Sequence, residues 1–255
     1  LNIPMDESVW YYTFFSGNIS FALGIGLIPL FHYWSLGVEE QYYLWYPWVA
    51  KYGKKHLLTI VMILCVLWFG MKMGSYVVFG KGLIYRLLSI TRFDCMMIGA
   101  IGAILYYKKA AWFIRMCANR VVVILAWVLF FTSGLYAQYI PAPIRAEYIS
   151  VVSLFVIMAG LVSKPLLENR VMNYLGKISY GIYVIHPLLI FVGSWIVKST
   201  GILSNAYGGG RWVVFASVSA LTILLASLSY KYLEMPFLRL KDKFSVVKST
   251  NESVK

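Results

Sequence analysis

The chain has 255 residues, of which 60% are hydrophobic and 13% are charged, with a mean hydropathy of +0.72. Soluble domains are roughly half apolar and one quarter charged, so this composition excludes an ordinary soluble domain and predicts an all-α, polytopic transmembrane helical bundle. The formal net charge of +13 lies in short connections and near the C-terminus, as membrane topology requires, which argues against a nucleic-acid partner.

Residues 10–31 are apolar but are interrupted by glycine, asparagine and proline. We expect a loop or a re-entrant segment here, and an additional membrane span is the alternative. After this segment, apolar stretches of helical length predict about seven membrane spans. They lie at residues 34–50, 57–74, 89–107, 120–139, 147–163, 173–197 and 211–232.

Lysine and arginine residues predict the orientation of these spans. They are more frequent in the odd-numbered connections and after the last span than in the even-numbered connections, to which Lys72 is assigned. The positive-inside rule then places the C-terminus in the cytoplasm, and the stretches 34–40 and 90–94 approach from the extracytoplasmic side. Residues 1–244 are expected to form one membrane domain, and residues 245–255 a polar cytoplasmic tail.

Two adjacent carboxylates, Glu39 and Glu40, lie in the first predicted span. Acids at membrane depth are costly, so they face a protein interior or a wet cavity and indicate function. Helical spacing puts Ser35, Glu39 and Tyr42 on one face, where they could present a hydroxyl, a carboxylate and a phenol to a common cavity. The alternative is that both acids lie at headgroup level and cap the start of the helix.

The sequence Thr91-Arg92-Phe93-Asp94 opens the third predicted span. An intramembrane arginine seeks a carboxylate, so Arg92 is a candidate partner for Glu39 or Glu40, and snorkelling to the interface is the alternative. Asp94 is expected to cap the helix. The small residues that follow, Gly99, Gly102 and Ala103, predict close helix packing.

A third polar group lies in the sixth predicted span. Ser179, Tyr183 and His186 share a helical face, and histidine is the side chain best suited to move protons near neutral pH. The alternative for His186 is a hydrogen-bonded structural residue. Pro187 is expected to kink this helix. Farther on, Glu234 is expected to lie at the interface, just after the last span.

The three cysteines, Cys65, Cys95 and Cys117, are scattered through or beside apolar runs. Neither a metal-ligand spacing nor a disulfide framework is present, so we interpret them as packing residues and expect no metal site.

Four motifs together resemble the membrane acyltransferase-3 family, which includes O-antigen and exopolysaccharide O-acetyltransferases. They are W-S-L-G-V-E-E-Q-Y-Y-L-W-Y-P, R-F-D, N-Y-L-G-K-I-S-Y-G-I-Y-V-I-H-P-L-L and E-M-P-F, in the family's order and over nearly the whole chain. The resemblance implies a fold of about ten transmembrane helices, of which about seven would be present here. The chain begins with Leu1 rather than Met, which fits an N-terminally truncated acyltransferase domain.

The resemblance also implies an activity. Members move an acyl group, usually acetyl, from cytoplasmic acetyl-CoA or another acyl-CoA to a hydroxyl of an envelope carbohydrate. The expected partners are therefore membrane lipid, acyl-CoA and a carbohydrate acceptor, with no bound cofactor and no implied oligomeric state. The expected location is the inner or plasma membrane. In the family, a histidine and arginines on the early helices are central to transfer, so this chain alone is expected to be inactive.

The resulting hypothesis makes Glu39, Glu40, Arg92 and His186 catalytic. One of the acids would orient or charge a base supplied by the early helices, and Arg92 would pair with an acid. The expected substrate-binding residues are Trp34, Ser35, Gln41, Tyr42, Ser179 and Tyr183. A proton-coupled transporter of a small molecule or glycan precursor is the alternative function, although no inverted repeat is detectable. A structural subunit is a further alternative.

Overall fold

The computed structural model describes residues 9–162, 169–200 and 209–244, and the predicted tail at 245–255 lies outside them. The described residues form helices joined by turns, without strands, which confirms the all-α prediction. The chain divides into two units, Leu1–Leu167 and Glu168–Lys255, and each is described by itself.

The predicted loop or re-entrant segment is a series of short helices. None of them is long enough to cross a bilayer, so the alternative of an additional span over residues 10–31 is wrong. Gly24 ends the second helix in the left-handed conformation, with φ of 77°, which a glycine adopts at little cost. The elements are α1 (Val9–Thr13), α2 (Gly17–Leu23) and η1 (Ile28–Tyr33).

Two long helices follow, α3 (Trp34–Gly53) and α4 (Leu57–Phe79), joined by the 3₁₀ turn η2 (Lys54–His56). By length and apolar composition, the described residues contain six stretches able to cross a membrane, against about seven predicted. The first stretch, Leu30–Phe79, holds both α3 and α4, which the prediction counted as two spans. The difference in number arises there.

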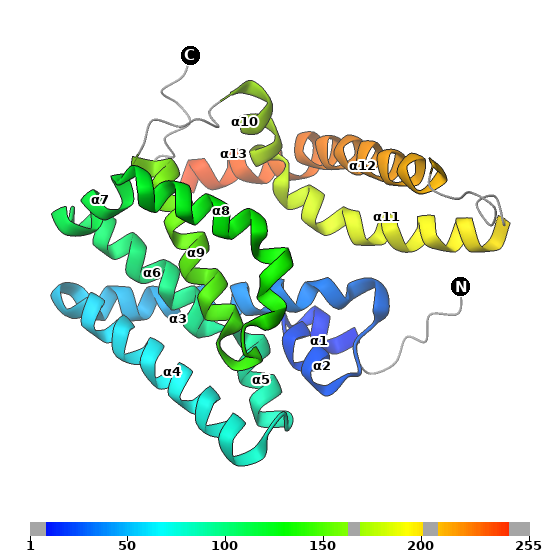
Figure 1. Cartoon of the computed structure of the whole chain (residues 1–255). Coiled ribbons are helices and arrows are strands. Elements are labelled where there is room, and N and C mark those ends of the chain that lie inside the picture. The colour runs from blue at the N-terminus through cyan, green and yellow to red at the C-terminus, as the bar shows by residue number, and fades with distance from the viewer. Residues whose placement is uncertain (1–8, 163–168, 201–208, 245–255) are drawn as a thin grey trace. The chain divides into compact units, whose positions relative to one another are not determined.

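The third predicted span is broken in two. Helix α5 (Leu83–Thr91) ends and α6 (Phe93–Tyr107) begins at Arg92, whose φ of 47° is left-handed. Helix α6 packs against α4, as Figure 1 shows. The close packing predicted for the small residues of α6 is confirmed at Gly102, where a Cβ would lie 2.3 Å from Cδ1 of Leu154 in α9. It is wrong at Gly99, which has no neighbour within 4 Å of such an atom.

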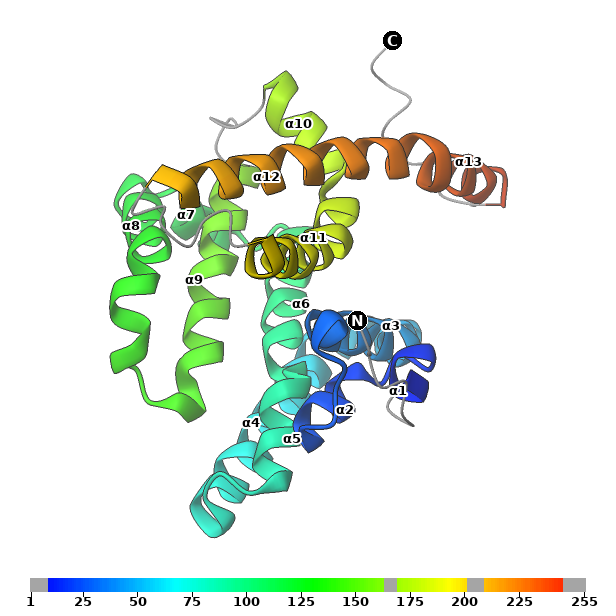
Figure 2. The same ribbon diagram turned by 90° about the vertical axis from the view of Figure 1, so that its right-hand side faces the viewer.

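The remainder of the first unit is a helical hairpin with a short helix before it. Figure 2 shows α8 and α9 running side by side in opposite directions, and α9 also packs against α6. The Oδ1 atom of Asn119 caps α8 by accepting the Val121 N–H at 2.9 Å. The elements are α7 (Ala111–Ala118), α8 (Arg120–Tyr136), η3 (Ala137–Tyr139) and α9 (Ala142–Val162).

Two apolar clusters form the core of this unit. One joins α3, α4 and α6, and the other joins α7 to α9. Because many large apolar side chains outside these clusters are exposed, the helices present a surface suited to lipid rather than to water. The buried members of the clusters are Tyr42, Val61, Met97 and Ile104 in the first, and Phe113, Cys117 and Met158 in the second.

In the second unit the predicted span 173–197 is interrupted at Ile178, whose side chain is fully buried. Helix α11 continues through Pro187 and packs against α12 (Figure 1). A π-helical turn, η4, then leads into the last helix. The elements are α10 (Arg170–Lys177), α11 (Ser179–Thr200), α12 (Gly209–Ser229), η4 (Tyr230–Glu234) and α13 (Met235–Phe244).

Candidate functional site

The R-F-D motif and the motif that begins W-S-L-G meet at the start of α3. The Cζ atom of Arg92 lies 4.9 Å from the ring centroid of Trp34, within the range of a cation–π contact. The Nε atom of Arg92 also donates to the carbonyl of Ser89 at 3.4 Å. The left-handed residue that ends α5 therefore turns its guanidinium back over the last turn of that helix, where carbonyls lack partners within the helix.

The predicted ion pair between Arg92 and either Glu39 or Glu40 is wrong. Among the described residues, ion pairs join Lys72 to Asp94 and Lys72 to Glu147. Arg92 instead contacts an aromatic ring and a backbone carbonyl, because the break between α5 and α6 directs it there.

The predicted shared face of α3 is divided between two environments. Glu39 and Glu40 are exposed, and Ser35 is half-buried. Tyr42 is 4% exposed and packs in an aromatic cluster, with ring centroids 4.9 Å from Tyr46 and 5.0 Å from Trp45. Tyr42 is therefore a core residue of the first unit, and the common cavity with Glu39 does not form there.

Gln41 forms a reciprocal amide pair with Asn18, which is only 2% exposed. Nε2 of Gln41 donates to Oδ1 of Asn18 at 2.9 Å, and Nδ2 of Asn18 donates back to Oε1 of Gln41 at 3.1 Å. Gln41 also donates to the carbonyl of Phe15, and Asn18 to the hydroxyl of Thr91. These contacts tie α3 to α2 and α5, so much of the Gln41 amide is engaged in holding the fold.

A buried ionic group lies where α4, α6 and α9 meet. Nζ of Lys72 lies 2.9 Å from Oδ2 of Asp94, with side chains 3% and 1% exposed, and also pairs with Glu147. Oδ1 of Asp94 accepts the backbone N–H of Cys95 at 2.9 Å, within the first turn of α6. The N-cap position itself is taken by Arg92, which makes no side-chain cap, so Asp94 is not the N-cap residue. The assignment of Lys72 to a connection is wrong, because the residue lies inside α4.

Sequence reasoning missed this group, although two signals for it were present. Lys72 ends one predicted apolar span and Glu147 begins another, so both are charges at the edge of membrane depth. Ionisable residues in such places pair with one another and mark functional regions. Three oxygen and sulfur ligands also gather here, from Asp94, Cys95 and Glu147, within 4.8 Å of one another. The Lys72 ammonium already pairs with both carboxylates, so a metal ion would have to compete with it.

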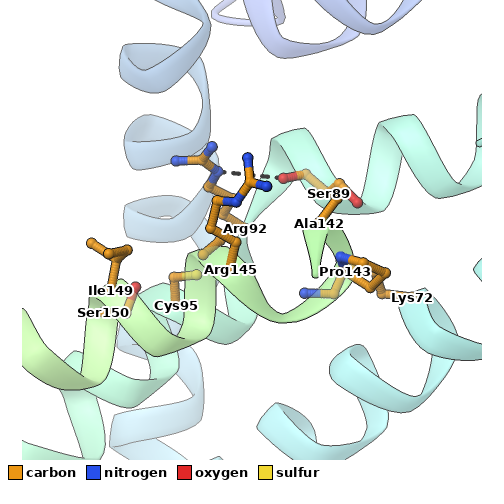
Figure 3. A pocket seen from close by; sticks show the side chains of 10 residues that line it. Lys72, Ser89, Arg92, Cys95, Ala142, Pro143, Arg145, Ile149 and Ser150 are labelled. Carbon is orange, nitrogen blue, oxygen red and sulfur yellow. Dashed lines mark hydrogen bonds between the residues drawn. The ribbon is translucent and has the colours of Figure 1, made fainter. Parts of the chain in front are cut away.

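Beside this ionic group lies a cavity of about 360 Å³. Figure 3 shows Arg92 and Arg145 among its lining side chains, from the α5–α6 junction and from α9. Arg145 donates through Nη2 to the carbonyls of Ile140 at 3.0 Å and Gln138 at 3.2 Å. The lining residues are Lys72, Ser89, Arg92, Cys95, Ala142, Pro143, Arg145, Ala146, Ile149 and Ser150.

In the second unit, Tyr183 and His186 are neighbours on α11, with ring centroids 6.1 Å apart. Nδ1 of His186 lies 2.9 Å from the carbonyl of Ile182. Ser179, predicted to share their face, is exposed and donates to the carbonyl of Gly176 at 2.8 Å. Its hydroxyl thus supports the junction of α10 and α11.

The I-S-Y-G-I-Y motif and the E-M-P-F motif meet inside this unit. A Cβ atom on Gly181 would lie 3.2 Å from Cα of Ala226 and 3.3 Å from Oε1 of Glu234. That carboxylate oxygen is buried and has no hydrogen-bond partner among the described residues. The prediction that Glu234 follows the last span is wrong, because the residue lies within the last apolar stretch, Trp212–Leu240, in a π-helical turn packed against α11.

The sequence profile of a family described as "Acyltransferase domain" matches residues 2–231. The chain is also 26% identical, over 249 residues, to O-acetyltransferase OatA of Staphylococcus aureus strains NCTC 8325 / PS 47 and COL. The match covers 90% of this chain and 39% of each relative, so the chain spans well under half their length. No solved structure matches the chain significantly.

Proposed function

The chain belongs to the membrane acyltransferase-3 family, and on this basis we propose that it takes part in transfer of an acetyl group to a carbohydrate hydroxyl. The observation that carries the proposal is the profile match over residues 2–231. The contact between Trp34 and Arg92 supports it, because it joins two motifs beside a polar cavity within apolar helices. The curated relatives, named O-acetyltransferases, favour acetyl as the acyl group and oxygen as its acceptor.

The proposed donor is acetyl-CoA. The acceptor hydroxyl oxygen attacks the thioester carbonyl, while a base takes the hydroxyl proton and a tetrahedral oxyanion forms. When the oxyanion collapses, the carbon–sulfur bond breaks and the thiol of coenzyme A leaves with a proton. Transfer needs a base near the acceptor and positive or hydrogen-bonding groups near the oxyanion.

His186 is the proposed base or proton carrier within the described residues. A proton on Nδ1, donated to the carbonyl of Ile182, leaves the imidazole lone pair on Nε2, the atom that can accept a proton. In the first unit, Glu39 or Glu40 would orient or charge a base supplied by the family's early helices, and Arg92 would supply positive charge. The proposed substrate-binding residues are Trp34, Ser35 and Gln41 in the first unit, and Ser179 and Tyr183 in the second. Tyr42 is not among them, because its ring is packed in the core of the first unit. The proposed location is the inner or plasma membrane, with a cytoplasmic C-terminus.

Radiolabelled transfer tests the proposal. Two proteins are expressed in membranes: the chain by itself, and the chain extended by the sequence encoded upstream of Leu1. Label from acetyl-CoA is then followed into lipid-linked and envelope carbohydrate. The extended protein is expected to transfer label, and the chain alone is expected not to. His186→Gln is expected to lower transfer on the order of a hundredfold, the scale of general base catalysis.

Matched variants make the test specific. Glu39→Gln and Glu40→Gln are expected to lower transfer, while Gln138→Glu, on the exposed turn η3, is expected to leave it unchanged. Absence of label transfer by a folded, extended protein with several acceptors would overturn the proposal and favour the transporter.

A further inference from the structure

We propose that the cavity lined by Arg92 and Arg145 binds the phosphate group of a ligand. The proposal concerns binding alone and stands apart from the acyl-transfer proposal. It rests on three observations within the first unit: the charges around the cavity, an unpartnered hydroxyl in its wall, and its size.

The charges leave a positive excess. Lys72 is the third cation in the wall, and it is matched by the two carboxylates of Asp94 and Glu147. The guanidiniums of Arg92 and Arg145 form no ion pair among the described residues and contact carbonyls or an aromatic ring instead. Together the five groups carry one net positive charge, which a single phosphodiester would neutralise.

The hydrogen-bonding groups also suit a phosphate. Each guanidinium presents five N–H donors in a planar fork, which matches phosphate oxygens in pairs. Arg92 uses one of its nitrogens on a carbonyl, and Arg145 uses Nε and Nη2. Donors therefore remain on both side chains. Arg92 is exposed and Arg145 is half-buried, so an anion that enters the cavity can accept hydrogen bonds from these donors.

Ser89 supplies the independent observation. Its Oγ atom is buried in the cavity wall and has no hydrogen-bond partner among the residues that the structure describes. A buried hydroxyl without a partner is uncommon, and an oxyanion in the cavity would accept from it. Ser150 places a second hydroxyl in the same wall.

The volume of the cavity favours a phosphate group over smaller anions. A volume of about 360 Å³ exceeds what a chloride or a lone carboxylate needs, and it falls within the range of small-molecule sites. Since Asp94 and Glu147 would repel an anion at the Lys72 end, the phosphate is expected between Arg92 and Arg145. A phospholipid headgroup or a phosphate ester from solution could each supply it.

Two probes distinguish these sources. Purified, delipidated protein in detergent is titrated with phosphatidylglycerol, followed by native mass spectrometry, and with glycerophosphoglycerol, the same headgroup without acyl chains. Arg92→Gln and Ser89→Ala are each expected to weaken binding of the effective probe, about tenfold for the arginine and less for the serine. Arg145→Gln is expected to act like Arg92→Gln.

Arg115→Gln is the matched control. Arg115 is an exposed arginine on α7 that, like Arg92, donates to a backbone carbonyl, but it lies outside the cavity. This variant is expected to bind the probes as the original protein does. Ser89→Ala removes no charge and no backbone contact, so it keeps the test valid if Arg145→Gln fails to fold.

The outcomes are distinct. Binding of the lipid alone, weakened by the cavity variants, supports the proposal with a lipid headgroup as the source. Binding of both compounds, weakened in the same way, supports it with a soluble phosphate ester as the source. Failure of both to bind, or equal binding by folded Arg92→Gln, Ser89→Ala and Arg115→Gln proteins, would overturn it.

Discussion

The ammonium of Lys72 lies 2.9 Å from Oδ2 of Asp94, and the two side chains are almost wholly removed from solvent. Glu147 pairs with the same ammonium. One cation thus holds carboxylates of α6 and α9 against α4. Removing one partner of a buried ionic group is costly, because the remaining charges keep their desolvation penalty and lose their compensation.

Lys72→Met should therefore destabilise the protein strongly. We expect the free energy of unfolding to fall by about 3–5 kcal/mol, since two buried carboxylates lose their partner. Chemical unfolding of the whole protein in detergent micelles measures this. Lys81→Met, in the exposed turn between α4 and α5, is the control and should change stability little. Equal effects of the two substitutions would contradict the structure.

The reciprocal pair of Asn18 and Gln41 predicts energetic coupling. Asn18→Ala and Gln41→Ala each leave the other residue's amide partly without a partner. The double variant should therefore lose less free energy of unfolding than the sum of the losses in the two single variants. A coupling energy of about 1 kcal/mol is expected from a double-mutant cycle. Strict additivity would show that the two amides do not interact.

Gly37, in the W-S-L-G motif, lies where α3 crosses the chain just before α2. A Cβ on Gly37 would lie 2.7 Å from the carbonyl oxygen of Phe15, and backbone there cannot move aside easily. Gly37→Ala should cost about 1–3 kcal/mol of stability.

Gly70→Ala, in α4, is the matched comparison. It meets nothing within 4 Å and should stabilise the helix by up to about 1 kcal/mol. Thermal unfolding of both variants, in the same detergent, checks the opposite signs.

Cys117 lies in α7, outside the six apolar stretches, and burial raises the pKa of its thiol above the ordinary value of 9.0. Less thiolate is therefore present at a given pH than in an exposed cysteine, and alkylation by maleimide should be slower. The folded state favours the neutral thiol, so the contribution to stability is complete below about pH 9 and is lost as pH rises through the folded-state pKa.

A variant that retains Cys117 as its single cysteine permits the measurement. Its labelling rate is followed from pH 7 to pH 10 and compared with that of the urea-unfolded protein. Equal rates in the two states would contradict the burial of Cys117 in the folded protein.

Much of the helical architecture could be predicted from the sequence, because it depends on local properties. Apolar runs of sufficient length identify helices, and the glycines and proline of residues 10–31 interrupt them. The break at Arg92 was less visible, since no glycine or proline marks it and the left-handed residue is an arginine. Local sequence preference gave no signal for that conformation.

The site residues were harder to predict because their partners come from other helices. Helical spacing correctly places Glu39 and Tyr42 near one another on α3, but it cannot say that Tyr42 packs against Tyr46 and Trp45. Likewise, charge alone marks Arg92 and Lys72 as needing partners. Tertiary packing decides that Lys72 takes the carboxylates, whereas Arg92 contacts Trp34.

The left-handed backbone at Arg92 sets the stability of the chain against the function that we propose for this residue. A side chain in this conformation costs about 1–2 kcal/mol, which glycine avoids. Glycine would also remove the guanidinium from Trp34 and from the cavity. Arg92→Gly should therefore relax the backbone while removing the guanidinium, so screening for thermal stability alone would select against the residue to which we assign acyl transfer and phosphate binding.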